Sequence, residues 1–154
     1  MSYNEREEIL KTMRATPVVL RAVVRDLDDE ALRRRPAPGE WAVIEVVAHL
    51  ADSEERARGR VEAMLARDDP ELPGYNQEQL AIDGRYLERD LGSELERYEV
   101  SRRRHVAMFE ALDDAGWRRT GRHSEHGRVT VQLYATHSAS EDVDHLAQIA
   151  RMVG

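Results

Sequence analysis

The 154-residue chain contains no cysteine, and only one of its 23 basic residues, Lys11, is a lysine. Without cysteine the protein can form no disulfide framework and no cysteine zinc finger, and it has no thiol nucleophile of its own. This absence is compatible with a reducing compartment, and we predict a cytoplasmic protein. The near absence of lysine is typical of a genomic composition bias.

The sequence also lacks a long hydrophobic run. Its most apolar stretch, residues 41–51, is about half the length of a membrane span and contains Glu45 and His49. The first eight residues are polar and acidic, unlike a secretory signal. These features predict no membrane partner.

A positive charge excess is missing as well. The 30 acidic residues outnumber the 23 basic ones, and the formal net charge is −7. Binding to phosphate backbones needs a concentrated positive face, so we predict no nucleic-acid partner. Two arginine triplets, residues 33–35 and 102–104, have acidic neighbours, and we expect both on the solvated surface.

Glycine and proline are scarce, with nine and five residues, and most of them fall in three clusters. The clusters separate four segments with helical apolar periodicity, at about residues 4–27, 41–66, 90–112 and 130–153. Helices of this length are each ~30 Å long. They predict an all-α fold, an antiparallel four-helix bundle with one long connection between its second and third helices. We expect a single domain over residues 1–154.

Several local patterns refine this prediction. Thr16-Pro17 suggests that the first helix kinks or restarts there. Ser93-x-x-Glu96 has the pattern of a capping box at the start of the third helix. A minor helix is expected near residues 78–83, and the run 128–133 is the one short β-branched stretch. The apolar stripes of the long helices include Val19, Leu133 and Val143, which we therefore expect to be buried.

The histidines are the main candidates for functional residues in the sequence. His137, Glu141 and His145 are spaced four residues apart on the last helix, so each lies ~6 Å along the axis from the next, on one face. Glu141 and His145 could grip one metal ion, with His49 of the second helix as a third ligand. Three protein ligands and an open position are typical of a catalytic metal. The alternative is an exposed charge pair between Glu141 and His145.

Other candidates are weaker. His137 is a spare ligand, a partner of a ligand or a solvated residue. His123 and His126 are expected in a glycine-bounded turn, and Tyr75 in the long connection is a candidate pocket residue. The sequence has no glycine-rich phosphate loop and no nucleophile elbow, so it gives no support for nucleotide hydrolysis or serine catalysis.

Three stretches together resemble one known family. Residues 38–54 begin the second helix with Trp41 and place His49-Leu50 two turns later. Residues 141–149 are similar to a closing motif His-x-x-x-His-Leu-x-Gln-Ile, and residues 117–127 to a tryptophan-to-glycine loop that precedes it. In this order and spacing they resemble the DinB/YfiT-like superfamily of four-helix bundles, over about residues 17–149.

The resemblance implies a divalent metal held by His49, Glu141 and His145, with zinc expected first and nickel or iron as alternatives. Glu141 departs from the common pattern, which has histidine there, although relatives resembling mycothiol-dependent maleylpyruvate isomerases also carry glutamate. The implied reaction uses a metal-activated water or a low-molecular-weight thiol on a small-molecule substrate, as a hydrolase or a thiol-dependent transferase or isomerase. A homodimer is implied as well. The alternative is a non-catalytic dimeric bundle whose metal site is vestigial or absent.

Overall fold

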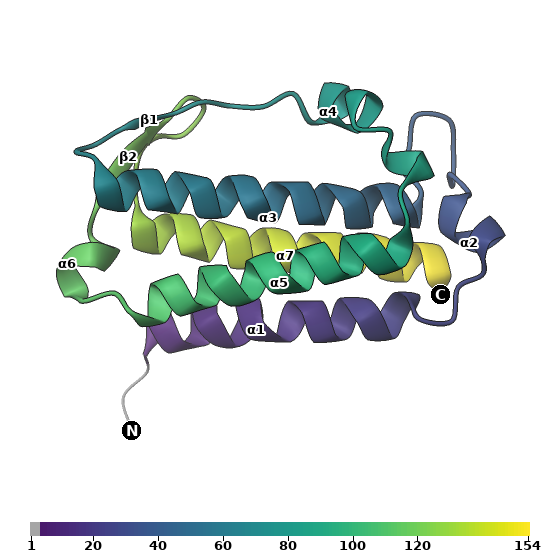
Figure 1. Ribbon diagram of the computed structural model, residues 1–154, viewed down its shortest axis with the longest axis horizontal. Helices are drawn as coiled ribbons and strands as arrows, with labels where there is room; N and C mark the ends of the chain where they lie inside the picture. The colour runs from purple at the N-terminus through teal and green to yellow at the C-terminus, as the bar shows by residue number, and fades with distance from the viewer. Residues whose placement is uncertain (1–3) are drawn as a thin grey trace.

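The computed structural model describes residues 4–154 and consists mainly of four long helices (Figure 1). These are α1 (Glu5–Val24), α3 (Val43–Ala66), α5 (Leu91–Glu110) and α7 (Val131–Val153). The shorter elements are α2 (Asp29–Arg33), β1 (Glu71–Leu72), α4 (Gln77–Asp83), the 3₁₀ helix η1 (Tyr86–Glu88), α6 (Asp114–Trp117), β2 (Thr120–His123) and β3 (Gly127–Thr130). The predicted four-helix bundle is confirmed, with the expected minor helix at α4. No helix of the described chain is both long and apolar enough to cross a membrane.

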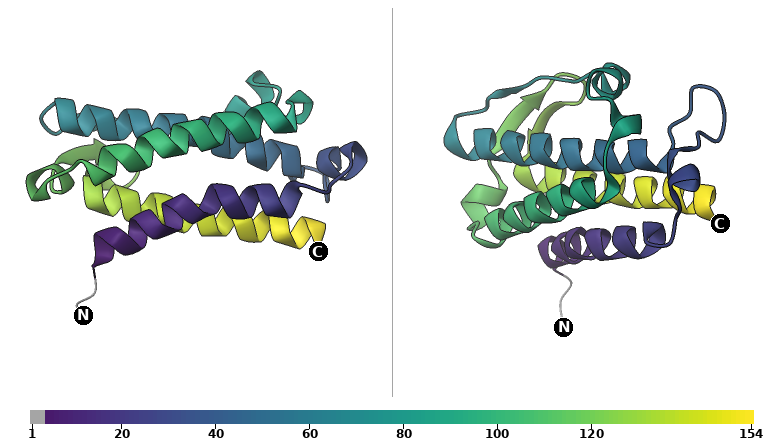
Figure 2. Two further views of the ribbon diagram at one scale, coloured as in Figure 1. Left: turned by 60° about the horizontal axis from the view of Figure 1, so that its bottom comes forward. Right: turned by 45° about the vertical axis from the view of Figure 1, so that its right-hand side comes forward.

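The four long helices form two pairs. The helices within each pair are parallel, and the two pairs run in opposite directions. In Figure 1, α1 and α7 run from left to right, whereas α3 and α5 run from right to left. Helix α1 packs on α7 and α3 packs on α5, and the two pairs form the two layers seen in Figure 2. Helices α3 and α5 are parallel because of the connection at residues 67–90. It returns along the length of the bundle, so α5 starts at the same end as α3.

Helix α1 continues through Pro17, so the predicted restart at this residue is wrong. Proline has no N–H group and leaves the carbonyl of Met13, four residues earlier, without its helical partner. The Nη1 atom of Arg102 in α5 donates to this carbonyl at 3.0 Å. A hydrogen bond from a neighbouring helix therefore replaces the one that Pro17 removes.

Helix α5 begins at Leu91, in agreement with the predicted segment, but its cap differs from the predicted one. Its N-cap is Asp90, whose carboxylate accepts a hydrogen bond from the backbone N–H of Ser93 at 2.9 Å. The predicted capping box at Ser93 is therefore wrong, because this residue lies inside the first turn. Helix α7 is capped by Thr130, whose hydroxyl accepts from the N–H of Leu133 at 3.0 Å.

A small three-stranded sheet at one end of the bundle was not predicted. Strand β1 pairs with β2 in parallel, and β2 pairs with β3 antiparallel. A Cβ atom at Gly121 would lie 2.8 Å from side-chain atoms of both Leu72 and Met64, so a larger residue there would force these side chains to move. The run 128–133 contains the end of β3 and the start of α7 rather than one strand.

The core fills the space between the two helix pairs and includes Met13, Leu20, Ile44 and Phe109, all at most 1% exposed. Three residues of the predicted apolar stripes lie outside it. Val19, Leu133 and Val143 are 42%, 55% and 56% exposed, so the prediction of their burial is wrong. The stripes are narrower than the sequence suggests because each helix packs mainly on two neighbours.

Candidate functional site

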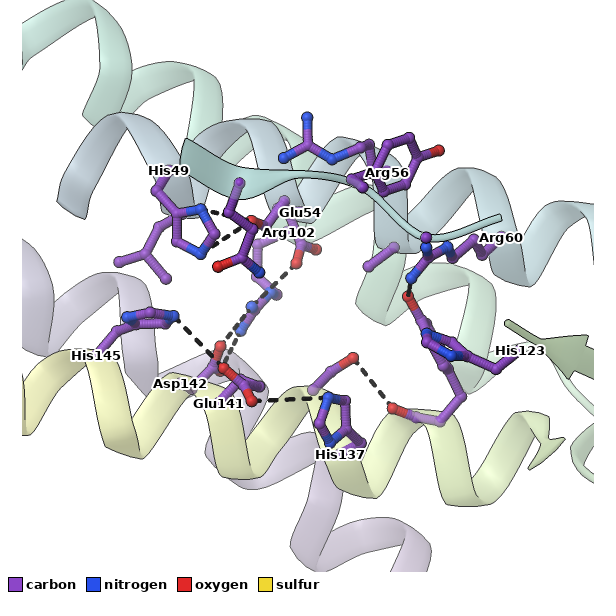
Figure 3. A pocket seen from close by; sticks show the side chains of 18 of the residues that line it. His49, Glu54, Arg56, Arg60, Arg102, His123, His137, Glu141, Asp142 and His145 are labelled. Carbon is purple, nitrogen blue, oxygen red and sulfur yellow. Dashed lines mark hydrogen bonds and ion pairs between the residues drawn. The ribbon is translucent and has the colours of Figure 1, made fainter. Parts of the chain in front are cut away.

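A pocket with a volume of about 540 Å³ lies between α3 and α7, beneath the long connection (Figure 3). Five of the six histidines line it: His49, His123, His126, His137 and His145. Helix α3 contributes one wall, α7 the opposite wall, and the β2–β3 turn closes one end. The histidines that the sequence singled out therefore share one cavity.

His49 lies deep in the pocket wall formed by α3, and the residue is only 3% exposed. Its ring lies 5.0 Å from that of Trp41 and 4.8 Å from that of His145, measured between centroids. Burial lowers the pKa of His49 to about 4, and the positive charge of Arg56 acts in the same direction. His49 is therefore neutral at physiological pH, and both of its ring nitrogens lie 3.3 Å from the hydroxyl oxygen of Ser53.

His145 faces His49 from α7, and its side chain is 16% exposed. Its Nδ1 lies 3.1 Å from Oε1 of Gln148, a contact that fits the tautomer with the proton on Nδ1. The lone pair is then on Nε2, which lies 3.5 Å from Oε2 of Glu141. Two ligand atoms bound at about 2.1 Å to one tetrahedral ion are ~3.4 Å apart, so this pair has the spacing of neighbouring ligands.

His137 lies on the other side of Glu141, with Nε2 3.7 Å from Oε1 of the carboxylate. His123 and His126 lie at the turn between β2 and β3, as expected, but they also reach the pocket. Their rings stack at 4.6 Å, and the ring of His126 lies 5.9 Å from that of His137. The imidazole rings and the Glu141 carboxylate thus form a row along the pocket, from the β2–β3 turn to His49.

Two groups of residues could hold a metal. In residues 4–154, the group whose ligand atoms all lie within 4.8 Å of one another is His123, Glu125 and His126. Glu125 and His126 are exposed, and Nδ1 of His123 already accepts from the N–H of Glu125 at 3.1 Å. The predicted ligands do not form so tight a group, although His145 is next to both of the others.

The predicted set nevertheless fits a divalent cation by its chemistry. Two imidazoles and a carboxylate are a common donor set for zinc and iron. The hydrogen bond to Gln148 orients His145 as such bonds orient metal-binding histidines elsewhere. Binding by His49, Glu141 and His145 stays a prediction.

Comparison with known proteins agrees with this architecture. The sequence model of the DinB superfamily matches residues 12–149. The chain belongs to the DinB superfamily. Two relatives are named putative metal-dependent hydrolases. One, from Oceanobacillus iheyensis, is 27% identical over 140 residues, which are 88% of this chain and 78% of the relative. The other, from Geobacillus kaustophilus, is 26% identical over 149 residues, covering 96% and 84%.

A solved structure is also similar to this DinB-superfamily chain. It is YfiT from Bacillus subtilis, described as a probable metal-dependent hydrolase with an unusual four-helix bundle topology. The TM-score is 0.84 at 22% identity, and the match covers 98% of this chain and 89% of the YfiT chain. At this identity the similarity establishes the fold, including a bundle topology that differs from the usual one.

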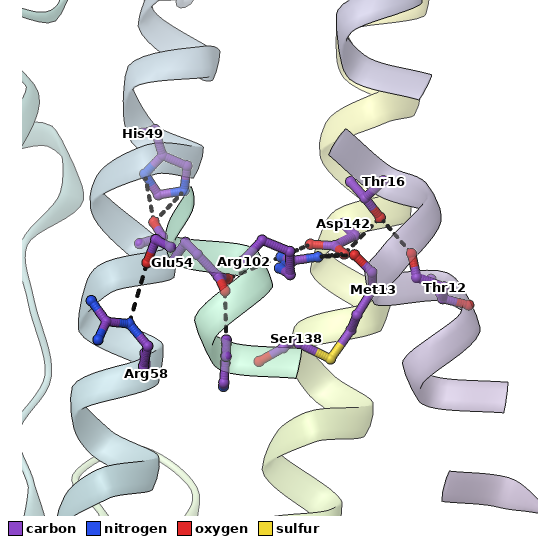
Figure 4. A network of polar contacts seen from close by, with 12 residues as sticks. Thr12, Met13, Thr16, His49, Glu54, Arg58, Arg102, Ser138 and Asp142 are labelled. Carbon is purple, nitrogen blue, oxygen red and sulfur yellow. Dashed lines mark hydrogen bonds and ion pairs between the residues drawn. The ribbon is translucent and has the colours of Figure 1, made fainter. Parts of the chain in front are cut away.

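The floor of the pocket in this DinB-superfamily chain is a buried network of charged residues that joins all four long helices (Figure 4). Arg102 donates to Asp142 at 2.6 and 2.9 Å and to Glu54 at 3.0 Å. Glu54 also pairs with Nδ1 of His105 at 2.8 Å, and Asp142 accepts from the hydroxyl of Thr16 at 2.7 Å. The expectation that the whole triplet 102–104 is solvated is wrong, because Arg102 is 3% exposed.

The network predicts a specific dependence of stability on pH. Burial acts to raise the pKa of Glu54, but the hydrogen bond from His105 and the positive charge of Arg102 outweigh it and hold the pKa below its usual 4.5. The ionised form therefore stabilises the fold, fully above about pH 4.5, and this contribution is lost as the pH falls through the lower pKa of the folded state. We expect Glu54→Gln to be less stable at pH 7 and to lose less stability between pH 4.5 and 3.

Urea unfolding at a series of pH values measures this effect. Glu62→Gln is the matched control, since Glu62 is an exposed glutamate of the same helix. It should keep the pH dependence of the parent. An equally steep loss of stability in Glu54→Gln and the parent would show that Glu54 does not carry the effect.

Proposed function

We propose that the protein is a metal-dependent enzyme of the hydrolase type that acts on a small molecule in the pocket between α3 and α7. One observation carries the proposal: His145 has its Nδ1 held by Gln148 and its Nε2 3.5 Å from Glu141, beside the buried neutral His49. The names of the two DinB-superfamily relatives describe metal-dependent hydrolases and support the same class.

Each residue of the proposed site has a separate role. His49 supplies a neutral imidazole from a rigid, buried helix position. His145 supplies a second imidazole from the opposite wall. Glu141, whose side chain is 47% exposed, supplies the carboxylate and also orients His137 on its other side. His137 is then placed to carry a proton between the site and solvent.

The metal supplies the nucleophile in this proposal. A divalent cation lowers the pKa of a water or thiol bound to it, which provides a nucleophile near neutral pH. Hydrolysis by water is the reaction that the relatives' names describe. A low-molecular-weight thiol is a second candidate, because two neutral imidazoles and one carboxylate leave one positive charge that a thiolate would neutralise. We propose zinc as the first candidate metal, ahead of nickel and iron.

Metal analysis of the purified protein tests the proposal. The protein is prepared without a histidine tag, and elemental analysis then measures zinc, nickel and iron per chain. We expect close to one metal per chain in the parent and less than a tenth of that in His145→Ala. His126→Ala is the matched control, since it removes an imidazole of the same pocket outside the proposed ligand set, and it should keep the metal.

Two results would contradict the proposal. Absence of metal after reconstitution at neutral pH would favour the non-catalytic helical bundle. Loss of metal in His126→Ala but not in His145→Ala would move the site to the group of His123, Glu125 and His126 at the β2–β3 turn.

A further inference from the structure

Two arginines of α3 face the pocket from the wall that carries His49. Arg56 and Arg60 are one turn apart and share the pocket-lining face of the helix with His49 and Ser53 (Figure 3). Their guanidinium carbons lie 5.0 and 4.9 Å from the ring centroid of Tyr75, which comes from the long connection. We call Arg56, Arg60 and Tyr75 the arginine clamp. It brings two positive charges to one wall of the pocket.

The acidic residues of α3 do not neutralise these charges. All five pair with other groups. Arg97 of α5 pairs with Asp52 and Glu55, and Arg58 pairs with Glu62. Glu45 pairs with Arg35, and Glu54 pairs with Arg102. Neither Arg56 nor Arg60 forms an ion pair with a carboxylate within the part of the chain that the structure describes. Both guanidinium groups therefore keep their charge for a ligand.

Arg60 is held in place by neutral groups. It donates to the hydroxyl of Tyr134 at 3.3 Å and to the carbonyl of Pro73. Its Nε atom is buried and has no hydrogen-bond partner. This atom is out of reach of a ligand, but each terminal nitrogen of Arg60 carries a second N–H group that can donate to a ligand oxygen. The position of Arg60 thus suits an oxygen ligand from the pocket.

The net charge of the pocket determines which kind of anion it favours. Three arginines and four carboxylates line it, which leaves one net negative charge; they are Arg56, Arg60, Arg102, Glu54, Glu125, Glu141 and Asp142. A divalent cation at the proposed metal site changes this to one net positive charge. A single monoanion then balances the pocket, which favours a carboxylate over a doubly charged phosphate.

We propose that the arginine clamp binds the carboxylate of a substrate whose reacting group lies at the His49 end of the pocket. The inference rests on the proposed function for the position of the reacting group. Arg56 and Arg60 follow His49 by two and three helical turns, so the clamp lies about 10–16 Å along the helix from it. Guanidinium groups bind carboxylates through paired, charge-assisted hydrogen bonds. The substrate is therefore an elongated carboxylic acid.

Calorimetric titration with simple probes tests the clamp. The protein is stripped of metal with a chelator, and a second sample is reloaded with zinc. Each is titrated with hexanoate, with its neutral analogue hexanamide and with inorganic phosphate. We expect hexanoate to bind more tightly than the other two. Arg56→Gln and Arg60→Gln should each weaken hexanoate binding by about tenfold or more. Arg58→Gln, which removes a charge of the same helix outside the pocket, should change it less than about twofold.

Each other result is decisive. Equal binding of hexanoate and hexanamide, or an equal loss in Arg58→Gln, would overturn the clamp, as would no binding of hexanoate to either sample. Tighter binding of phosphate would overturn the choice of carboxylate. Hexanoate binding that depends on Arg56, in a protein that takes up no zinc when it is reloaded, would keep the clamp and reject the proposed function. Metal binding that depends on His145, without hexanoate binding, would do the reverse.

A series of dicarboxylates from malonate to suberate tests the separation between the two ends. In the zinc-loaded protein, affinity should rise with chain length as the second carboxylate comes to reach the clamp. In the metal-free protein, the rise should be absent. The same weak affinity for all lengths in the zinc-loaded protein would overturn the proposed distance.

Discussion

Replacing Arg102 with methionine is expected to lower the free energy of unfolding by about 3–5 kcal/mol. The guanidinium group is buried and holds Asp142 and Glu54 on two other helices. Without it, the two carboxylates lose the guanidinium group that they share and keep only the His105 ring and the Thr16 hydroxyl as partners. The Met13 carbonyl, four residues before Pro17, also loses its donor. Removal of one member of a buried charge network costs far more than the network contributes as a whole.

Urea unfolding measures this loss, and two further variants separate its causes. Arg103→Met removes the neighbouring arginine, which is exposed, and should change the stability by less than about 0.5 kcal/mol. The triple variant Arg102→Met, Glu54→Gln, Asp142→Asn removes the buried charges together and should be more stable than Arg102→Met alone. If Arg102→Met and Arg103→Met lose the same small amount, the network does not hold the helices together.

A divalent metal is expected to stabilise the protein by about 4 kcal/mol when its free concentration is a thousand times its dissociation constant. For a chain of this size, that corresponds to a rise in Tm of roughly 8–16 °C. The rise follows because the ion binds the folded pocket, whereas His49, on α3, and His145, on α7, are far apart in the unfolded chain. Differential scanning calorimetry with and without zinc measures it.

Glu141→Gln is the informative variant for this experiment. The Glu141 side chain is about half exposed, so the metal-free variant should unfold at nearly the same temperature as the parent. With zinc, we expect its rise in Tm to be much smaller, while Glu141→His, which restores the common histidine pattern, should keep the rise. An equal rise in Glu141→Gln and the parent would place the metal elsewhere in the pocket.

The sequence predicted the local structure well where neighbouring residues decide it. The four helical segments and the minor helix near residues 78–83 follow from apolar periodicity and breakers, and the structure confirms them. The residues that cap the helix starts were predicted less accurately. At α5 two acceptors, Asp90 and Ser93, compete to cap the same turn, and the sequence pattern selected the wrong one. The strands were missed because each is at most four residues long.

The candidate site was predictable only in part. His49, Glu141 and His145 were selected by spacing and resemblance, and the structure places all three in one pocket. The roles of Arg102, Arg56 and Arg60 were not predictable, because an arginine looks the same in sequence whether it is solvated, buried or turned toward a ligand. The difference depends on which carboxylates the packing brings near it.

Contacts within one helix join residues that are three or four positions apart in the sequence. The amino-acid order alone was therefore enough to specify four amphipathic helices and the side of α7 that carries Glu141 and His145. Contacts between helices depend on the direction in which residues 67–90 return, since this sets α3 and α5 parallel and decides which side chains meet. The burial of Arg102 and the free charges of Arg56 and Arg60 arise only at that level. Distant parts of the chain must pack before those electrostatic environments exist.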